Sequence, residues 1–184
     1  MAQGIPQRYH DALAAIHSAI RPRSLPRTGI VLGTGLGDWV ERLRGVSAIS
    51  YTDIPGFPQS TVETHSGRLV FAEIGSVPVW ILQGRFHLYE GYGPEEVCTG
   101  IRILGMLGVR RVVLTNASGA INPDFSVGNI MVLSDQINMT GENPLRGANV
   151  DDWGPRFPDM SAVYDPTLQT AALEAATACG LRPE

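Results

Sequence analysis

Apolar residues recur at helical spacing near the start of the chain and then give way to short apolar runs. Leu13, Ile16 and Ile20 form one helical stripe, which ends at Arg21 and Pro22. The segments that follow indicate strands and one short helix. We expect strands over residues 28–32, 67–74 and 78–82, the last two around Gly75 and Ser76 in one of several possible hairpins, and a helix containing Trp39, Val40 and Leu43.

The second half of the chain alternates helices with further apolar runs. A helix is expected from Pro94 to Gly108, with its apolar stripe at Val97, Ile101, Leu104 and Leu107. Strands covered on both faces are expected over residues 111–115 and 129–133. A last helix is expected between Asp165 as N-cap and Gly180 as C-cap, with apolar positions at Leu168, Ala171, Ala172, Ala175 and Cys179.

This alternation of strands and helices favours an α/β fold, a mixed and largely twisted β-sheet flanked by helices. The chain has 184 residues, 43% of them hydrophobic and 17% charged, so it can bury one sizeable core and we expect a single domain over 1–184. Only LRPE follows Gly180, where the next buried strand of an α/β fold would begin. We therefore expect an incomplete domain whose C-terminal strands are missing.

Charge and hydropathy exclude several kinds of partner. A formal net charge of −4 and a pI near 5.5 leave no basic face for a nucleic-acid backbone, so no nucleic acid is expected. The N-terminal residues lack the apolar run of a signal peptide, and no stretch reaches membrane-spanning length. We expect no membrane partner and a cytoplasmic protein, with Cys98 and Cys179 as small buried residues rather than a disulfide.

A glycine-rich segment, GTGLG at residues 33–37, follows the first predicted strand and is a candidate for ligand binding. Its glycines let backbone amides point outward and Thr34 adds a hydroxyl, which together suit an oxyanion. The segment matches neither the dinucleotide fingerprint GxGxxG nor a P-loop. Taken alone it favours a tight turn without a ligand.

The segment QGRFHLYEGY, residues 83–92, carries polar side chains at alternate positions. In an extended chain Gln83, Arg85, His87 and Tyr89 would lie on one face. Arginine offers a rigid fork of donors that fits a phosphate, and histidine adds a donor whose charge responds to pH. A polar surface strand explains the spacing equally well, so both interpretations stay open.

The segment TNASGAINP begins at the end of the predicted strand 111–115. Asn116, Ala117 and Ser118 would therefore lie at a strand's carboxyl end, where open α/β sheets bind ligands, although a polar strand exit is the alternative. His65 follows a proline-rich stretch and belongs to a loop, where a lone histidine is usually solvated. No HExxH, CxxC or paired-histidine spacing occurs, so no metal site is expected.

Taken together and in order, these segments resemble the trimeric class of purine nucleoside phosphorylases. The resemblance is carried by GTGLG, THSGR, QGRFHLYEGY, TNASGAINP, NPLRG (residues 143–147) and RFPDMS (residues 156–161), which span nearly the whole chain. It implies a nucleoside phosphorylase-like fold and the reversible phosphorolysis of inosine or guanosine to free purine and ribose 1-phosphate, with inversion at the anomeric carbon. It also implies no cofactor, with phosphate as co-substrate, and a homotrimer whose active sites straddle the interfaces.

The resemblance assigns roles to individual residues, with Arg85 and His87 as the catalytic pair. It implies that phosphate is held by Thr34, His65, Arg85, Phe86, His87 and the amide of Ala117. It implies that the nucleoside meets Tyr89 and Asn116, together with Trp153 from a neighbouring subunit. Thr34 stands where the family commonly has serine and keeps the hydroxyl, whereas Trp153 is bulkier than the family's usual phenylalanine.

Two alternatives remain beside the phosphorylase. The family's base-recognising residues fall beyond Glu184, so we expect little or no turnover from the 184-residue chain. The first alternative is accordingly a catalytically inactive binding or assembly module that retains the phosphate half of the site. The second is a methylthioadenosine or xanthosine phosphorylase; the methylthioadenosine enzymes rank lower because they carry a different segment where this chain has GRFHLYEGY.

Overall fold

The computed structural model describes residues 3–59 and 67–183. The chain divides into two compact units, the first formed by Met1–Ala117 with Asn143–Gly154 and the second by Ser118–Glu142 with Pro155–Glu184. Every described residue predicted for the site belongs to the first unit. The expectation of a single domain over the whole chain stays a prediction.

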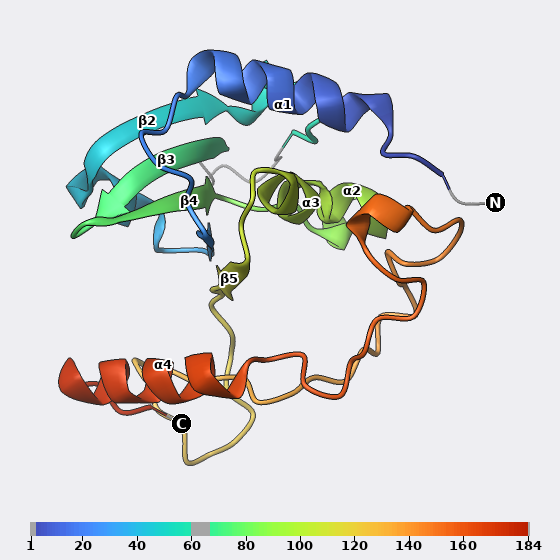
Figure 1. Cartoon of the computed structure of the whole chain (residues 1–184). Coiled ribbons are helices and arrows are strands. Elements are labelled where there is room, and N and C mark those ends of the chain that lie inside the picture. The colour runs from blue at the N-terminus through green and yellow to red at the C-terminus, as the bar shows by residue number, and fades with distance from the viewer. Residues whose placement is uncertain (1–2, 60–66, 184) are drawn as a thin grey trace. The chain divides into compact units, whose positions relative to one another are not determined.

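A five-stranded mixed sheet forms the centre of the first unit (Figure 1). Its strands are β1 (Thr28–Leu32), β2 (Arg44–Ser50), β3 (Arg68–Ile74), β4 (Val77–Gln83) and β5 (Arg111–Leu114), in the order β2-β3-β4-β1-β5. Strand β1 runs parallel to β4 and β5, whereas β3 is antiparallel to β2 and β4. The predicted α/β fold with a mixed sheet is confirmed, and residues 67–83 form the hairpin that the sequence left open.

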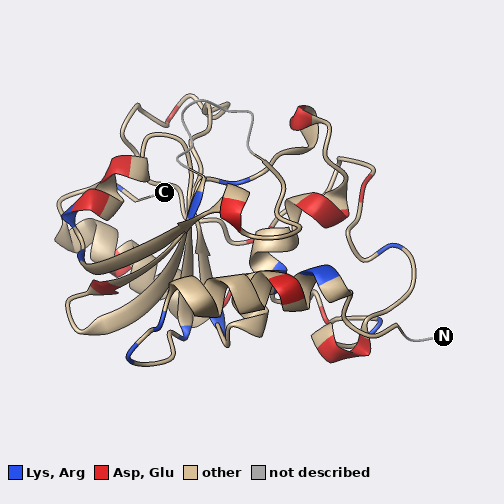
Figure 2. Ribbon diagram, turned by 90° about the horizontal axis from the view of Figure 1, so that it is seen from above, with Lys and Arg blue, Asp and Glu red and all other residues tan. Residues whose placement is uncertain are grey.

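Helices cover the sheet and carry its connections. Helix α1 (Gln7–Ala19) lies over the strands, as the side view of Figure 1 and the view from above in Figure 2 both show. Helices α2 (Pro94–Val97) and α3 (Thr99–Met106) follow β4. No helix in residues 3–59 and 67–183 combines the length and the apolar character needed to cross a bilayer. Short 3-10 helices complete the first unit: η1 (Gly37–Arg42), η2 (Tyr51–Asp53), η3 (Leu88–Glu90) and η4 (Asp151–Trp153).

The two faces of the sheet bury separate sets of side chains. Strand β3 alternates between them, with Leu69 and Phe71 in one core and Val70 and Ala72 in the other. Because both faces are covered, β3 and β4 are nearly continuous in apolar residues. The larger core also contains Tyr9, Ile16, Trp80, Ile103 and Leu104, and the smaller one contains Leu32, Val40, Val79 and Ile81.

The helix predicted over residues 94–108 is broken into α2 and α3 at Cys98. Leu104 and Leu107 of the expected stripe are buried, whereas Ile101 is 40% exposed and Ile103 is fully buried instead. Gly100 lies so close to β4 that a Cβ there would be 2.8 Å from the Leu82 Cδ1 atom. Cys98 is half-buried, and burial raises the pKa of its thiol.

Strand β5 is present as predicted, but the expectation that both its faces are covered is wrong for the described chain. Val113 is 45% exposed and Leu114 is 62% exposed. The strand forms one edge of the sheet and pairs only with β1. A strand this apolar is usually covered on both faces by other elements. Within the described residues β5 does not have that cover.

The second unit contains α4 (Pro166–Ala178), whose ends match the sequence prediction. The Asp165 carboxylate accepts hydrogen bonds from the backbone N–H groups of Thr167 and Leu168, and Gly180 has a φ of +72° after the last turn. The predicted apolar stripe is not buried, because only Ala176 of this helix is inaccessible to solvent. Cys179 is exposed, contrary to expectation.

The strand predicted over residues 129–133 does not form. Ile130 makes only an isolated bridge with Pro183. No named strand occurs among the described residues of the second unit, so this apolar run has no ladder to join there. An apolar run alone does not specify a strand without a partner.

Candidate functional site

The three segments singled out in the sequence begin at one edge of the sheet. Strand β1 lies between β4 and β5 and is parallel to both, with Leu32 opposite Gln83 and Val31 opposite Leu114. The carboxyl ends of these strands are therefore adjacent. Residues 33–37, 84–90 and 115–117 leave the sheet side by side, which is where open α/β sheets bind ligands.

Gly33 is the point at which the three segments touch. A Cβ atom at this buried position would lie 2.6 Å from the Thr115 carbonyl oxygen, 2.7 Å from Arg85 Nη1 and 2.8 Å from Asn116 Cα. No real side chain fits at such distances, so glycine is required here by close approach rather than by its φ angle. The structure thus brings the glycine-rich loop, Arg85 and Asn116 together at Gly33.

The Gly33–Gly37 loop turns directly after Gly33, and its next two residues are exposed. The Leu36 N–H donates to the Gly33 carbonyl over 3.2 Å, and Gly35 has a φ of +84°, which places it in the left-handed region. Thr34 and Gly35 are exposed. Within residues 3–59 and 67–183 nothing accepts a hydrogen bond from the N–H groups of Thr34 and Gly35, so both amides can donate to a ligand.

Arg85 and His87 are held together beside this loop. Arg85 Nη1 donates to the Thr115 carbonyl at 2.7 Å, and Arg85 Nε donates to His87 Nε2 at 3.1 Å. Because a guanidinium can only donate, Nε2 is an acceptor and the proton of the neutral imidazole lies on Nδ1. These contacts leave further N–H donors of the half-buried guanidinium for a ligand.

Glu90 fixes the other side of the histidine ring. Its Oε1 atom accepts from His87 Nδ1 at 2.7 Å and from the His87 backbone N–H at 2.9 Å, while the Glu90 N–H donates to the His87 carbonyl at 3.1 Å. The Glu90 side chain is only 1% exposed. This carboxylate therefore sets the tautomer and orientation of the imidazole.

The remaining residues of the second segment separate into different environments. The extended alternation predicted from Gln83 onward is interrupted at Gly84, whose φ is +107°, and it ends after His87, because Leu88–Glu90 forms η3. Tyr89 is 76% exposed and stacks on His87, with ring centroids 4.6 Å apart and an interplanar angle of 17°. Phe86 is 4% exposed and its ring packs on Tyr51, so only its backbone can meet a polar ligand.

Gln83 has a structural position instead of the ligand-facing one that the alternation suggested. Its side chain is 2% exposed, its Nε2 donates to the Gly37 carbonyl at 2.9 Å, and its Oε1 accepts from Arg68 Nε at 2.9 Å. Arg68 in turn pairs with Glu41 over 2.7 Å. The glutamine thus links the end of the glycine-rich loop to β3.

Asn116 and Ala117 follow Thr115 at the exit of β5 and are exposed. The Asn116 backbone touches Gly33, and its Nδ2 atom lies 3.5 Å from the Ala117 carbonyl oxygen. Ala117 follows directly, and its small side chain leaves its own backbone accessible. His65 lies outside the described residues.

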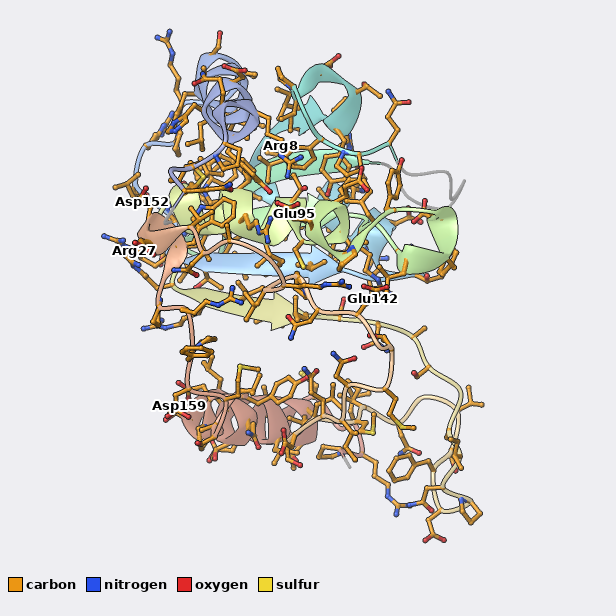
Figure 3. All side chains as sticks on the ribbon, turned by 90° about the vertical axis from the view of Figure 1, so that its right-hand side faces the viewer. Arg8, Arg27, Glu95, Glu142, Asp152 and Asp159 are labelled. Carbon is orange, nitrogen blue, oxygen red and sulfur yellow. The ribbon has the colours of Figure 1, made fainter. Side chains whose placement is uncertain are left out.

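Trp153 packs elsewhere in the first unit, against α1 and α3. Its ring meets Tyr9 edge-on with centroids 5.0 Å apart, and the Arg102 guanidinium lies 4.4 Å from its centroid. Arg102 also donates to the Tyr9 hydroxyl and to Glu95, and Glu95 faces Arg8 over 3.3 Å (Figure 3). Among the described contacts none joins Trp153 to Arg85 or His87.

Sequence reasoning missed three residues that shape the site: Gln83 as a structural link, Glu90 and Thr115. Glu90 had a readable signal, because His87-x-x-Glu90 has the spacing by which a side chain three residues along caps a helix start. Thr115 and Gln83 had none, since their partners come from other strands. The described residues hold no group of three or more His, Cys, Asp or Glu side chains arranged for a metal ion.

Known proteins share both the sequence and the fold of this chain. A sequence model of the Phosphorylase superfamily matches residues 27–183. Purine nucleoside phosphorylase 1 of Bacillus subtilis is 46% identical over 147 residues, covering 80% of this chain and 54% of the relative. Purine nucleoside phosphorylase of Bos taurus is 45% identical over 176 residues, covering 94% and 60% respectively. The chain thus spans little more than half the length of these relatives.

A solved structure agrees over the whole chain. The crystal structure of isoform 2 of purine nucleoside phosphorylase from Schistosoma mansoni, in complex with cytosine and ribose-1-phosphate, superposes with a TM-score of 0.86 at 35% sequence identity. The match covers 100% of this chain and 66% of that one. The mixed sheet described above therefore belongs to a fold that this solved structure shares.

Proposed function

Because the chain belongs to the phosphorylase superfamily, we propose that the Gly33–Gly37 loop, Arg85 and His87 form the phosphate site of a purine nucleoside phosphorylase. The observation that carries this proposal is the meeting of three strand ends at Gly33, where outward amides and a guanidinium lie together. Main-chain donors, a fixed positive charge and an imidazole are the groups that bind a phosphate oxyanion.

The reaction proposed is the reversible phosphorolysis of inosine or guanosine. A phosphate oxygen forms a bond to the anomeric carbon as the glycosidic C–N bond breaks, and the departing electron pair and a proton go to the purine. The chain's own task is to hold phosphate at the right distance and orientation, which is catalysis by positioning and electrostatics. Phosphate is a co-substrate in this scheme, which uses no metal or organic cofactor.

Each polar group has a part in the proposed site. Arg85 neutralises phosphate charge, and the amides of Thr34 and Gly35 with the Thr34 hydroxyl donate to its oxygens. The single lone pair of His87 Nε2 already accepts from Arg85 Nε, so the imidazole steadies the guanidinium and would accept from the O–H of hydrogen phosphate only in place of that bond. The backbone N–H groups of Phe86 and Ala117 are further donors, and His65 is assigned to phosphate by the resemblance.

The nucleoside is proposed to lie on the solvent side of this cluster. Tyr89, exposed and stacked on His87, is placed to meet a ribose hydroxyl, with Asn116 nearby. The resemblance assigns Trp153 to the ribose of a neighbouring subunit in a homotrimer, and in its own chain Trp153 packs on Tyr9 and Arg102. A cytoplasmic location completes the proposal.

The experiment that tests the phosphate site is the pair of variants Arg85→Ala and Arg110→Ala. Both remove one positive charge, but Arg110 is exposed at the other end of β5, outside the site. Calorimetric titration with inorganic phosphate should show Arg85→Ala weakened by roughly ten- to two-hundredfold, since charge-assisted hydrogen bonds contribute about 1.5–3 kcal/mol each. Arg110→Ala should bind like the unaltered chain. Equal losses in both variants would contradict the assignment of Arg85.

Inosine cleavage, followed by ultraviolet absorbance with and without phosphate, tests the reaction itself. Phosphate-dependent release of hypoxanthine supports the phosphorylase. Phosphate uptake without cleavage by the 184-residue chain supports the inactive binding module, and cleavage that does not depend on phosphate would contradict phosphorolysis. Methylthioadenosine and xanthosine as alternative substrates decide between the proposed activity and its nearest relatives.

A further inference from the structure

Thr115, the first residue after β5, contacts both halves of the proposed phosphate site without facing its exposed side. Its Oγ1 accepts a hydrogen bond from the Gly33 N–H at 2.9 Å and donates to the Val31 carbonyl at 2.8 Å. Its own carbonyl accepts from Arg85 Nη1 at 2.7 Å. One half-buried side chain and its peptide group therefore join the last residues of β1, the start of the glycine-rich loop and the arginine.

The hydroxyl sets the direction of the loop. With its N–H turned toward Thr115, Gly33 directs its first amide into the sheet, and the chain then turns so that Thr34 and Gly35 are exposed. The bond from the Leu36 N–H to the Gly33 carbonyl closes this turn. Releasing the Gly33 N–H would free the peptide to rotate and would leave the outward amides without a fixed orientation.

The far end of the same loop is held from the opposite side. Gln83, at the end of β4, donates to the Gly37 carbonyl at 2.9 Å. Thr115 belongs to the β5 side of β1 and Gln83 to the β4 side, so the loop after β1 is tied to both of its neighbouring strands. With the far end fixed, the Thr115 hydroxyl is the side-chain contact that holds the start of the first turn.

We propose that Thr115 is a positioning residue for phosphate: its hydroxyl orients the loop amides and its carbonyl orients Arg85, so that phosphate affinity depends on a side chain that phosphate does not touch. The inference rests on the proposed function, because it requires that this loop and Arg85 bind phosphate. It assigns a role in phosphate binding to Thr115, and the place of this residue directly after β5 does not by itself indicate that role.

The test uses substitutions that change the hydroxyl and little else. Thr115→Val keeps the branched shape suited to a strand but removes both hydroxyl hydrogen bonds. Thr115→Ser keeps the hydroxyl, and Thr115→Cys replaces it with a weak donor and acceptor. Thr99→Val is the matched control, because Thr99 is a buried threonine of α3, 3% exposed, whose hydroxyl donates to the Glu95 carbonyl at 3.5 Å.

Calorimetric titration of the 184-residue chain with inorganic phosphate should give the order Thr and Ser tightest, then Cys, then Val. Loss of a neutral hydrogen bond predicts a dissociation constant raised roughly two- to tenfold in Thr115→Val. Thr99→Val should bind like the unaltered chain even if it unfolds at a lower temperature. A purely structural role would lower the unfolding temperature of both valine variants and leave both affinities unchanged.

Amide hydrogen exchange of Gly33, followed by NMR, reports the contact directly and should accelerate in Thr115→Val but not in Thr115→Ser. If Thr115→Val does not fold, the Cys variant supplies the comparison. Uptake of phosphate that neither Thr115→Val nor Thr115→Cys weakens would overturn the role of Thr115 while leaving the proposed function intact. Absence of phosphate uptake by the unaltered chain would overturn both.

Discussion

Gly33→Ala is the most direct challenge to the geometry of the site, because it adds one carbon atom where three segments meet. That carbon would lie 2.6 Å from the Thr115 carbonyl oxygen, 2.7 Å from Arg85 Nη1 and 2.8 Å from Asn116 Cα. Carbon atoms in proteins normally approach to about 3.5–4 Å, so the neighbours must move by roughly 1 Å. Two of these neighbours are backbone atoms and the third is tied to one of them by a hydrogen bond.

Relief of this overlap should separate β1 from β5 and displace the guanidinium. Overpacking of this kind lowers the free energy of unfolding by about 1–3 kcal/mol, which for a chain of this size corresponds to a lowering of the unfolding temperature by roughly 2–12 °C. Phosphate binding should fall as well, because the donors no longer converge on one point. The measurements are thermal unfolding by circular dichroism and calorimetric titration with phosphate.

Gly105→Ala is the matched control. Gly105 lies in α3, and nothing is within 4 Å of the position that its Cβ would take. Alanine favours a helix over glycine by about 1 kcal/mol, so this variant should be slightly more stable and should bind phosphate unchanged. If Gly33→Ala matched Gly105→Ala in both stability and phosphate affinity, the argument that the three segments meet at Gly33 would be refuted.

Two further predictions concern stability. Tyr51→Phe removes a hydrogen bond of 2.9 Å to the buried Gly84 carbonyl and should cost about 1–3 kcal/mol of unfolding free energy in urea titrations. Burial raises the pKa of the Tyr51 phenol above its ordinary value of about 10. The neutral phenol therefore contributes its full stabilisation below about pH 10, and this contribution is lost as the pH rises further. The unaltered chain should lose stability more steeply in alkali than Tyr51→Phe, and equal slopes would contradict the assignment of the shift to Tyr51. Asp165→Ala removes the carboxylate that accepts from the Thr167 and Leu168 N–H groups and should destabilise α4 by about 1 kcal/mol, whereas Asp165→Asn should be nearly neutral. Circular dichroism measures the helicity of both variants, and unchanged helicity in Asp165→Ala would argue against the cap.

Local signals in the sequence predicted the elements that depend on local physics. Strand β1 was predicted with its observed bounds, because five apolar or small residues precede a glycine turn. Helix α4 was predicted with the correct ends, because Asp165, Pro166 and Gly180 are residues that begin and end helices. These features require no information about the rest of the chain.

What the sequence could not show is which surfaces meet. Residues 129–133 have the same apolar character as β1, but the described part of their unit offers no strand to pair with. The helix over 94–108 was predicted as one piece because residues 95–107 include no proline, yet the structure has a break at Cys98 between α2 and α3. The apolar pattern alone did not decide the structure in either place.

The sequence names candidate members of the proposed site but not the contacts between them. Arg85, His87, Thr34 and Asn116 were identified from residue chemistry and from the family resemblance. The link between Arg85 and Thr115 joins residues 30 positions apart, and that between Gly33 and Thr115 joins residues 82 positions apart. Such contacts depend on the order β4-β1-β5, which no local pattern encodes.

The parallel register of β4, β1 and β5 has a consequence for how this sequence can change over evolution. Loops that join the strands at a distance from Gly33 can lengthen or shorten, since the sheet absorbs such changes without moving its carboxyl edge. A single-residue deletion inside β1 is different, because each of Ile30, Val31 and Leu32 would then point to the other face of the sheet. The glycine turn would also shift out of register with the ends of β4 and β5. Length variation among descendants of this chain should therefore concentrate in the connections and spare the three parallel strands.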